Sequence, residues 1–149
     1  LLEDWADTAL ASGCRLALLQ AAAGDPVLRT ALLPEATPAP LRQLVGGLPA
    51  ALLGGVGDTL GGMLAGDAPR QLQRNLEQLA VLCAANPYLV GDALSLADLA
   101  VAAQLSLLSF PASSGAPLAG RGVSGIADNP LLASLFLWRD QLLPQRAPA

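Results

Sequence analysis

The sequence predicts an all-α fold, a bundle of five to six helices that forms a single domain over residues 1–149. Hydrophobic residues make up 53% of the chain, but only five residues are aromatic. The core must therefore consist of Leu, Ala and Val, and a chain rich in Leu and Ala favours helix over sheet. The strong periodic segments repeat apolar residues every three or four positions, and the length suits one domain.

The first helix is predicted from Leu1 to Ala23. Apolar residues recur there at helical spacing, and acidic residues occupy the first turn, where the helix dipole favours negative charge. The sequence "GDP" at Gly24–Pro26 ends this helix, and a short helical piece is expected from Pro26 to Leu33. The proline-rich segment Pro34 to Pro40 is expected to be a connector.

A second helix is expected from about Leu41 to Leu64, with Pro49 kinking it or beginning a new segment. It contains "GGVGDTLGG", which has a superficial likeness to a phosphate-binding loop. No strand precedes this stretch, the chain has no lysine, and the glycine spacing matches neither nucleotide fingerprint. Close approach of two helices, or a bend, explains the glycines better.

The third helix follows "GDAP", with Asp67 as the predicted N-cap and Pro69 in the first turn. Its apolar face is predicted to consist of Leu72, Leu76, Leu79, Ala80 and Cys83.

The fourth helix is predicted from Leu96 to about Phe110. The segment Pro111 to Asp128 is long for a structureless connection, so it is expected to be either functional or mobile. The last helix is predicted in "NPLLASLFLWRDQLL". Its expected apolar stripe consists of Leu131, Leu135, Trp138 and Leu142.

Ser95 and Asp98 have the spacing of a helix-capping box at the start of the fourth helix. The Ser95 hydroxyl would accept from the N–H of Asp98, and the Asp98 carboxylate would accept from the N–H of Ser95. A catalytic acid or base at Asp98 is the alternative. It is disfavoured because Asp98 has neither a second carboxylate at helical spacing nor a histidine to work with.

The composition excludes several classes of function. The net charge is −4, and the eight arginines are scattered, so no basic stripe for nucleic acid is present. The chain has no histidine, which removes the Ser-His-Asp class and the commonest metal ligand. We therefore predict no catalytic residue and no metal site in this chain.

Cys14 and Cys83 lie far apart within helical patterns, so free thiols and a reducing, cytoplasmic compartment are expected. The apolar stretch Leu99 to Phe110 is too short to span a bilayer, and no signal segment opens the chain. No membrane association is predicted.

The segment "YLVGDALSLADLAVAAQL" resembles the signature of the C-terminal helical domain of cytosolic glutathione transferases. That signature has an aromatic residue, then "LVGD", a serine or threonine, and an aspartate three residues later. In the family the last two form the capping box of a buried helix, which matches Ser95 and Asp98. The ending "NPLLASLFLWRDQLL" is similar to the family's late helix, so the resemblance is expected to cover almost the whole chain.

The resemblance implies that glutathione is the co-substrate of the parent protein, and that no cofactor is bound by this segment. Members of the family activate glutathione through a Tyr, Ser or Cys of an N-terminal thioredoxin-like domain. Nothing here matches that domain. The chain opens with leucine in mid-pattern, so we expect a fragment that lacks this domain and is inactive alone.

By the same resemblance, the first helix faces the missing domain and lines the cleft for a small hydrophobic electrophile. The candidate substrate-binding residues are Trp5, Thr8, Ser12 and Arg15. A homodimer is also implied.

A non-catalytic interaction or assembly module is the alternative function. Helical domains of this kind also serve as docking surfaces in larger assemblies. Only 13% of the residues are charged, which suits either a dimer or a partner interface.

Overall fold

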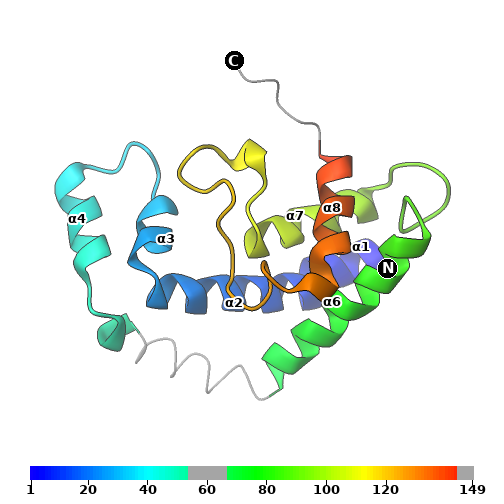
Figure 1. The fold of residues 1–149 in the computed structure, drawn as a ribbon, viewed down its shortest axis with the longest axis horizontal. Helices are drawn as coiled ribbons and strands as arrows, with labels where there is room; N and C mark the ends of the chain where they lie inside the picture. The colour runs from blue at the N-terminus through cyan, green and yellow to red at the C-terminus, as the bar shows by residue number, and fades with distance from the viewer. Residues whose placement is uncertain (54–66, 144–149) are drawn as a thin grey trace.

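The computed structural model describes residues 1–53 and 67–143 of the chain (Figure 1). The predicted second helix beyond residue 53, with all of "GGVGDTLGG", and the final "PQRAPA" lie outside the described residues. The all-α prediction is confirmed. Within the two described ranges, the β pairing consists of one isolated bridge between Ser109 and Gly122.

The helices are joined mostly by short connections. In chain order they are α1 (Leu2–Trp5), a π-helical turn (Ala6–Leu10), α2 (Ala11–Gly24), α3 (Pro26–Ala31), α4 (Ala39–Gly47), α6 (Ala68–Ala85), α7 (Leu96–Leu108) and α8 (Ala133–Leu142). Two 3-10 turns, Ala112–Ser114 and Pro130–Leu132, lie before and at the start of the last helix.

The first predicted helix is confirmed as one continuous rod, because α1, the π turn and α2 follow each other with helical backbone angles at each junction. The rod ends at Gly24, and Asp25 adopts an extended conformation (φ −120°, ψ 102°). The Asp25 carboxylate then accepts from the backbone N–H groups of Val27 and Leu28, at 2.9 and 3.2 Å. Asp25 thus caps α3 and separates the two helices.

The helix α4 begins at Ala39, so the connector is shorter than predicted. Its proline lies in the first turn, where a missing N–H costs nothing. The helix ends at Gly47, and Leu48 is extended before a second helical stretch begins at residue 50. Pro49 therefore begins a new segment, one of its two predicted effects.

The helix α6 starts at the predicted position, but the Asp67 side chain makes no capping hydrogen bond. Its carboxylate lies 3.7 Å from the Arg70 guanidinium instead. The predicted apolar face is confirmed, with Leu72, Leu76, Leu79 and Ala80 buried and Cys83 half-buried.

The helix α7 ends at Leu108, two residues before the predicted end, because Ser109 turns into extended backbone. The backbone N–H of Phe110 donates to the backbone carbonyl of Arg121 at 2.8 Å, and the N–H of Val123 donates to the carbonyl of Leu108 at 2.8 Å. Gly122 packs so closely that an added Cβ would lie 2.6 Å from the Leu108 carbonyl. The long segment after α7 is thus tied back to the end of the helix.

The last helix differs from the predicted stripe at its start. Leu131 is 70% exposed, so its predicted place on the buried face was wrong. The first turn, Pro130–Leu132, is 3-10, with three residues per turn rather than 3.6. This rotates the face that meets the core, and Leu132 is buried instead, together with Leu135, Phe136 and Trp138.

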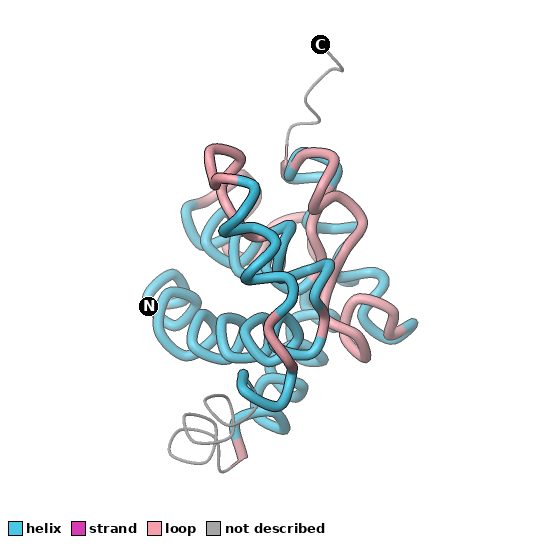
Figure 2. Tube along the Cα trace, turned by 90° about the vertical axis from the view of Figure 1, so that its left-hand side faces the viewer, coloured by secondary structure: helices cyan, strands magenta, loops and turns pink. Residues whose placement is uncertain are grey.

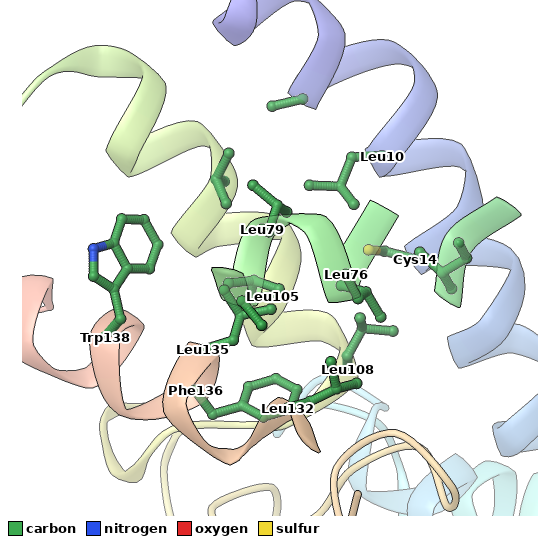
Figure 3. Close-up of a cluster of buried hydrophobic side chains, with 14 of the residues drawn as sticks. Leu10, Cys14, Leu76, Leu79, Leu105, Leu108, Leu132, Leu135, Phe136 and Trp138 are labelled. Carbon is green, nitrogen blue, oxygen red and sulfur yellow. The ribbon is translucent and has the colours of Figure 1, made fainter. Parts of the chain in front are cut away.

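The hydrophobic core lies between the first rod, α6, α7 and α8 (Figure 3). Its largest fully buried members include Leu10, Leu76, Leu105 and Leu135, one from each of these elements. The helices α3 and α4 contribute nothing to this cluster. They lie at the far left end of the molecule in Figure 1, and the turned view in Figure 2 shows loops running between the helices.

Candidate functional site

The polar candidates of the first helix form an exposed row. Thr8, Ser12 and Arg15 are all exposed, at spacings of four and three residues. The Thr8 hydroxyl donates to the Asp4 carbonyl at 2.7 Å, and the Ser12 hydroxyl donates to the Thr8 carbonyl at 2.8 Å. Each hydroxyl has therefore used its proton within the helix, and a ligand could only donate to it.

This row lies at and just after the π-helical turn, Ala6–Leu10. The Ala11 N–H donates to the Ala6 carbonyl, five residues back, instead of the usual four. Such turns are rare and are frequent at functional sites. Neither the turn nor its position could be read from the residue pattern.

Trp5 lies apart from the polar row. It is half-buried against the core and lines a hollow of about 400 Å³ between the start of the first rod and α6. Asn75, Leu79 and Leu82 form the wall on α6. Thr8, Ser12 and Arg15 do not line this hollow, so the structure divides the four predicted site residues into two groups.

A second hollow, of about 320 Å³, lies where α2, the start of α6 and the loop after α7 meet. Gly13 and Leu16 line it from α2, Pro69 and Leu72 from α6, and Val123 from the loop. Gly13 allows the helices to approach, because an added Cβ would lie 3.1 Å from the Leu72 side chain. The walls are mostly apolar, which suits a hydrophobic ligand.

The predicted capping box is present and is more extensive than predicted. The fully buried Asp98 carboxylate accepts from Ser95 N–H at 2.8 Å and from the Ser95 hydroxyl at 2.6 Å. It also accepts from the N–H of Leu89, at 2.7 Å, which lies in the preceding turn. Asp98 therefore ties the "NPYLVGD" turn to α7.

Two buried arginines were missed by sequence reasoning. Arg29 of α3 is 9% exposed and donates to five backbone carbonyls, at 2.8 to 3.2 Å. These carbonyls belong to the last turns of two helices, Ala22 and Ala23 of α2 and Val45, Gly46 and Leu48 at the end of α4. A guanidinium there satisfies orphan carbonyls and complements both helix dipoles.

Arg139 has the same role at the end of α7. It is 2% exposed, donates to the carbonyl of Ser109, and pairs with Asp140 at 2.6 Å. Its guanidinium lies 5.3 Å from the centroid of the Phe136 ring. The basic residue is visible in the sequence, but its acceptors lie 30 residues away, so the contact could not be predicted.

The two cysteines are free, as predicted: Cys14 is buried and Cys83 is half-buried. Burial raises the pKa of the Cys14 thiol to about 12. Burial, with a smaller contribution from the Asp98 carboxylate, also raises the pKa of Cys83 to about 12. A thiol with this pKa carries almost no thiolate at neutral pH, so neither cysteine is poised as a nucleophile.

Taken together, these features define an all-α domain whose central helix is capped by a buried carboxylate and enclosed by the first rod, α6 and α8. The buried charged groups of its interior, Arg29, Asp98 and Arg139, serve helix ends. The described residues contain no helix long and apolar enough to cross a membrane.

The family model described as the C-terminal domain of glutathione S-transferase matches residues 62–116. The match includes α6, α7 and the turn between them, and thus Ser95 and Asp98. The resemblance predicted from the sequence is confirmed over these residues, which are consistent with a C-terminal domain of the glutathione S-transferase type. The first rod, α3, α4 and α8 lie outside the matched residues, so the match is shorter than expected.

Searches of the curated proteins and of the solved structures found no significant match.

Proposed function

We propose that this chain forms the helical half of a glutathione transferase-like protein, in which it supplies the hydrophobic-substrate side of the cleft and dimer contacts. Glutathione would be the co-substrate, held by a thioredoxin-like domain before Leu1, and the compartment would be the cytoplasm. The observation that carries the proposal is the family match over residues 62–116, with the Ser95–Asp98 box at its centre.

The surface of the first rod supports this assignment of the cleft. Thr8, Ser12 and Arg15 are exposed in one row, and the rod carries a π turn at that point. The two hydroxyls have their protons engaged, so Arg15 is the donor in the row that is not committed to the helix backbone. We therefore assign Arg15 to a polar group of the bound substrate, and Trp5 to an apolar contact.

The test is a glutathione-conjugation assay with a chloronitrobenzene electrophile, on the protein that includes the upstream domain. We expect turnover, and retention of the protein on immobilised glutathione. Residues 1–149 alone should be inactive, because the group that activates the glutathione thiol would lie outside them. The transferase proposal would be refuted by a complete protein that is not retained on immobilised glutathione and does not conjugate glutathione to the electrophile.

The role of Arg15 is tested in the same assay. Arg15→Ala should raise the KM for the electrophile by about tenfold, the effect of one lost charged contact. The matched control is Arg74→Ala, since Arg74 is exposed on α6 and lies outside the row. Equal effects of the two substitutions would remove Arg15 from the cleft.

A non-catalytic assembly module is the second candidate, and the distribution of exposed apolar side chains favours it. Leu41, Leu44 and Leu52 are each more than half exposed in the α3–α4 region and the stretch after it. A surface of this kind is typical of a docking site. This function predicts a stable complex without glutathione turnover, whereas the transferase predicts turnover whether or not a partner is present.

A further inference from the structure

A third hollow, of about 450 Å³, lies between the α3–α4 pair and the loop that follows α7. It is at the left of Figure 1, where the loop passes beside α3. Its apolar wall includes Pro26, Val27 and Ala31 of α3 and Pro117 of the loop. Two arginines, Arg42 from α4 and Arg121 from the loop, line the same hollow.

The Arg42 guanidinium is held in place by backbone carbonyls. Nη1 donates to the Thr30 carbonyl at 3.3 Å, and Nη2 donates to the carbonyls of Pro34 at 2.9 Å and Glu35 at 3.5 Å. These bonds join α4 to the end of α3 and to the connector. The side chain is therefore fixed before any ligand arrives, which reduces the entropy lost on binding.

Arg121 is fixed in a similar way. Its Nε donates to the Pro117 carbonyl at 2.8 Å, and its own carbonyl accepts from Phe110 N–H at 2.8 Å. Gly120, with φ of +78°, permits the turn that places Arg121 there. The Nε bond leaves the two terminal nitrogens as the donors available to a ligand.

Among the described residues, no carboxylate forms an ion pair with either charge. The ion pairs within residues 1–53 and 67–143 join Arg70 to Asp67 and Arg139 to Asp140. Asp25, next in the chain to Pro26 of the hollow, uses its carboxylate to cap α3, and Glu35 meets Arg42 through its backbone carbonyl, at 3.5 Å. Two guanidinium groups, that of the half-buried Arg42 and that of the exposed Arg121, thus lie beside an apolar wall without an ion pair to a described carboxylate, in a chain with a net charge of −4.

We infer that this hollow binds a small organic anion, an alkyl carboxylate or an alkyl phosphate. The oxyanion would be held by the fork of Arg121, whose geometry matches both head groups, and Arg42 would add a second positive charge beside it. The alkyl body would lie on Pro26, Val27 and Pro117. This inference does not depend on glutathione, since none of these residues belongs to the proposed cleft.

Three probes with the same tail test the inference: octyl phosphate, octanoate and the neutral octyl glucoside. Binding to residues 1–149 is measured by isothermal titration calorimetry. We expect at least one anionic probe to bind, and the glucoside to bind at least about tenfold more weakly, the effect of one lost charge-assisted contact. Comparison of the two anions identifies the preferred head group.

The variants Arg42→Gln and Arg121→Gln should each raise the Kd for the anionic probe by about tenfold or more. Arg74→Gln removes the same charge from the outer face of α6 and should leave the Kd unchanged. Thermal melting of each variant checks that it is folded. Because Arg42 also joins α3 to α4, Arg121→Lys is a further variant that keeps the charge but removes the fork, and it should bind more weakly than the native chain.

Three results would overturn the inference. The first is no binding of either anion at about 10 mM, where a site with a Kd near 1 mM would be mostly occupied. The second is equal affinity for the glucoside and the anions, which would make the hollow a general apolar surface. The third is an equal loss in Arg74→Gln and Arg121→Gln, which would reduce the effect to overall charge.

Discussion

Leu76, Leu105 and Leu135 are fully buried and come from three different helices, whereas α4 contains no buried residue at all. The helices around α7 are held by a shared apolar core. The α3–α4 pair is held by Arg29, which donates five hydrogen bonds to backbone carbonyls, and by Arg42. One region therefore depends on a shared apolar core, and the other on buried and half-buried guanidinium groups, with Leu28 as its one large buried apolar side chain.

This difference has a consequence for cooperativity. Apolar contacts that link four elements couple their stabilities, so the core region should unfold as a unit. The α3–α4 pair is attached to the end of α2 largely through Arg29, so it can open by itself as a unit of lower stability. The predictions below test this contrast, beginning with the largest expected effect.

Leu105→Ala should lower the free energy of unfolding by about 4 kcal/mol, because it leaves a cavity in a core without exposed neighbours. Chemical denaturation measures the change. The matched control is Leu44→Ala in α4, where the side chain is 62% exposed and the loss should be under about 0.5 kcal/mol. Similar losses at both positions would contradict the contrast between the regions.

Asp98→Ala should lower the free energy of unfolding by about 3 kcal/mol, since three donors lose a buried charged acceptor. The fall in melting temperature is the measurement. Asp98→Asn keeps one acceptor oxygen and the volume of the side chain, so it should lose less. An unchanged melting temperature in Asp98→Ala would show that the capping box is not important for the fold.

Arg29→Met should act locally rather than globally. Removal of the five hydrogen bonds should raise hydrogen exchange at amides of α3 and α4 by about tenfold or more, while amides of α7 remain protected. Arg74→Met on the exposed face of α6 is the control and should change neither region. If α7 loses protection to the same extent as α4, the two regions are one cooperative unit.

Ionisation of the cysteine thiols should affect the free energy of unfolding only at high pH. The pKa of Cys14 is about 12 in the folded chain and near 9 when unfolded, so between these values the unfolded state has lost a proton that the folded state keeps. Stability should therefore fall as pH rises, by up to about 1.4 kcal/mol per pH unit for this thiol. Denaturation at pH 8 and pH 11 should show a smaller decrease in Cys14→Ala than in the native chain. Identical decreases would assign the alkaline loss to other groups.

The sequence was most informative where the interactions are local. The box at Ser95 and Asp98 spans three residues, and its partners are fixed by helix geometry, so it could be predicted together with the family. The face of α6 followed from periodicity in the same way. By contrast, the Leu89 N–H that Asp98 also binds lies in the preceding turn, and nothing in the pattern indicates it.

Contacts between distant segments explain the features that were missed. Arg29 and Arg139 are ordinary arginines in the sequence, and only the tertiary arrangement brings helix ends to them. Leu131 was placed wrongly because a 3-10 turn changes the rotation per residue. The candidate cleft residues remain a prediction. They were taken from a family resemblance, and the structure separates Trp5 from the polar row.

The π turn in the first rod also bears on how the chain can be compared with its relatives. A five-residue turn in place of a four-residue one accommodates one extra residue without breaking the helix. All positions from Ala11 onward are then shifted by one residue, about 100° around the axis, relative to a regular helix. A relative without this extra residue would need a one-residue gap between Ala6 and Leu10 in an alignment. Without that gap, its counterpart of Arg15 would be assigned to a residue on a different face of the helix.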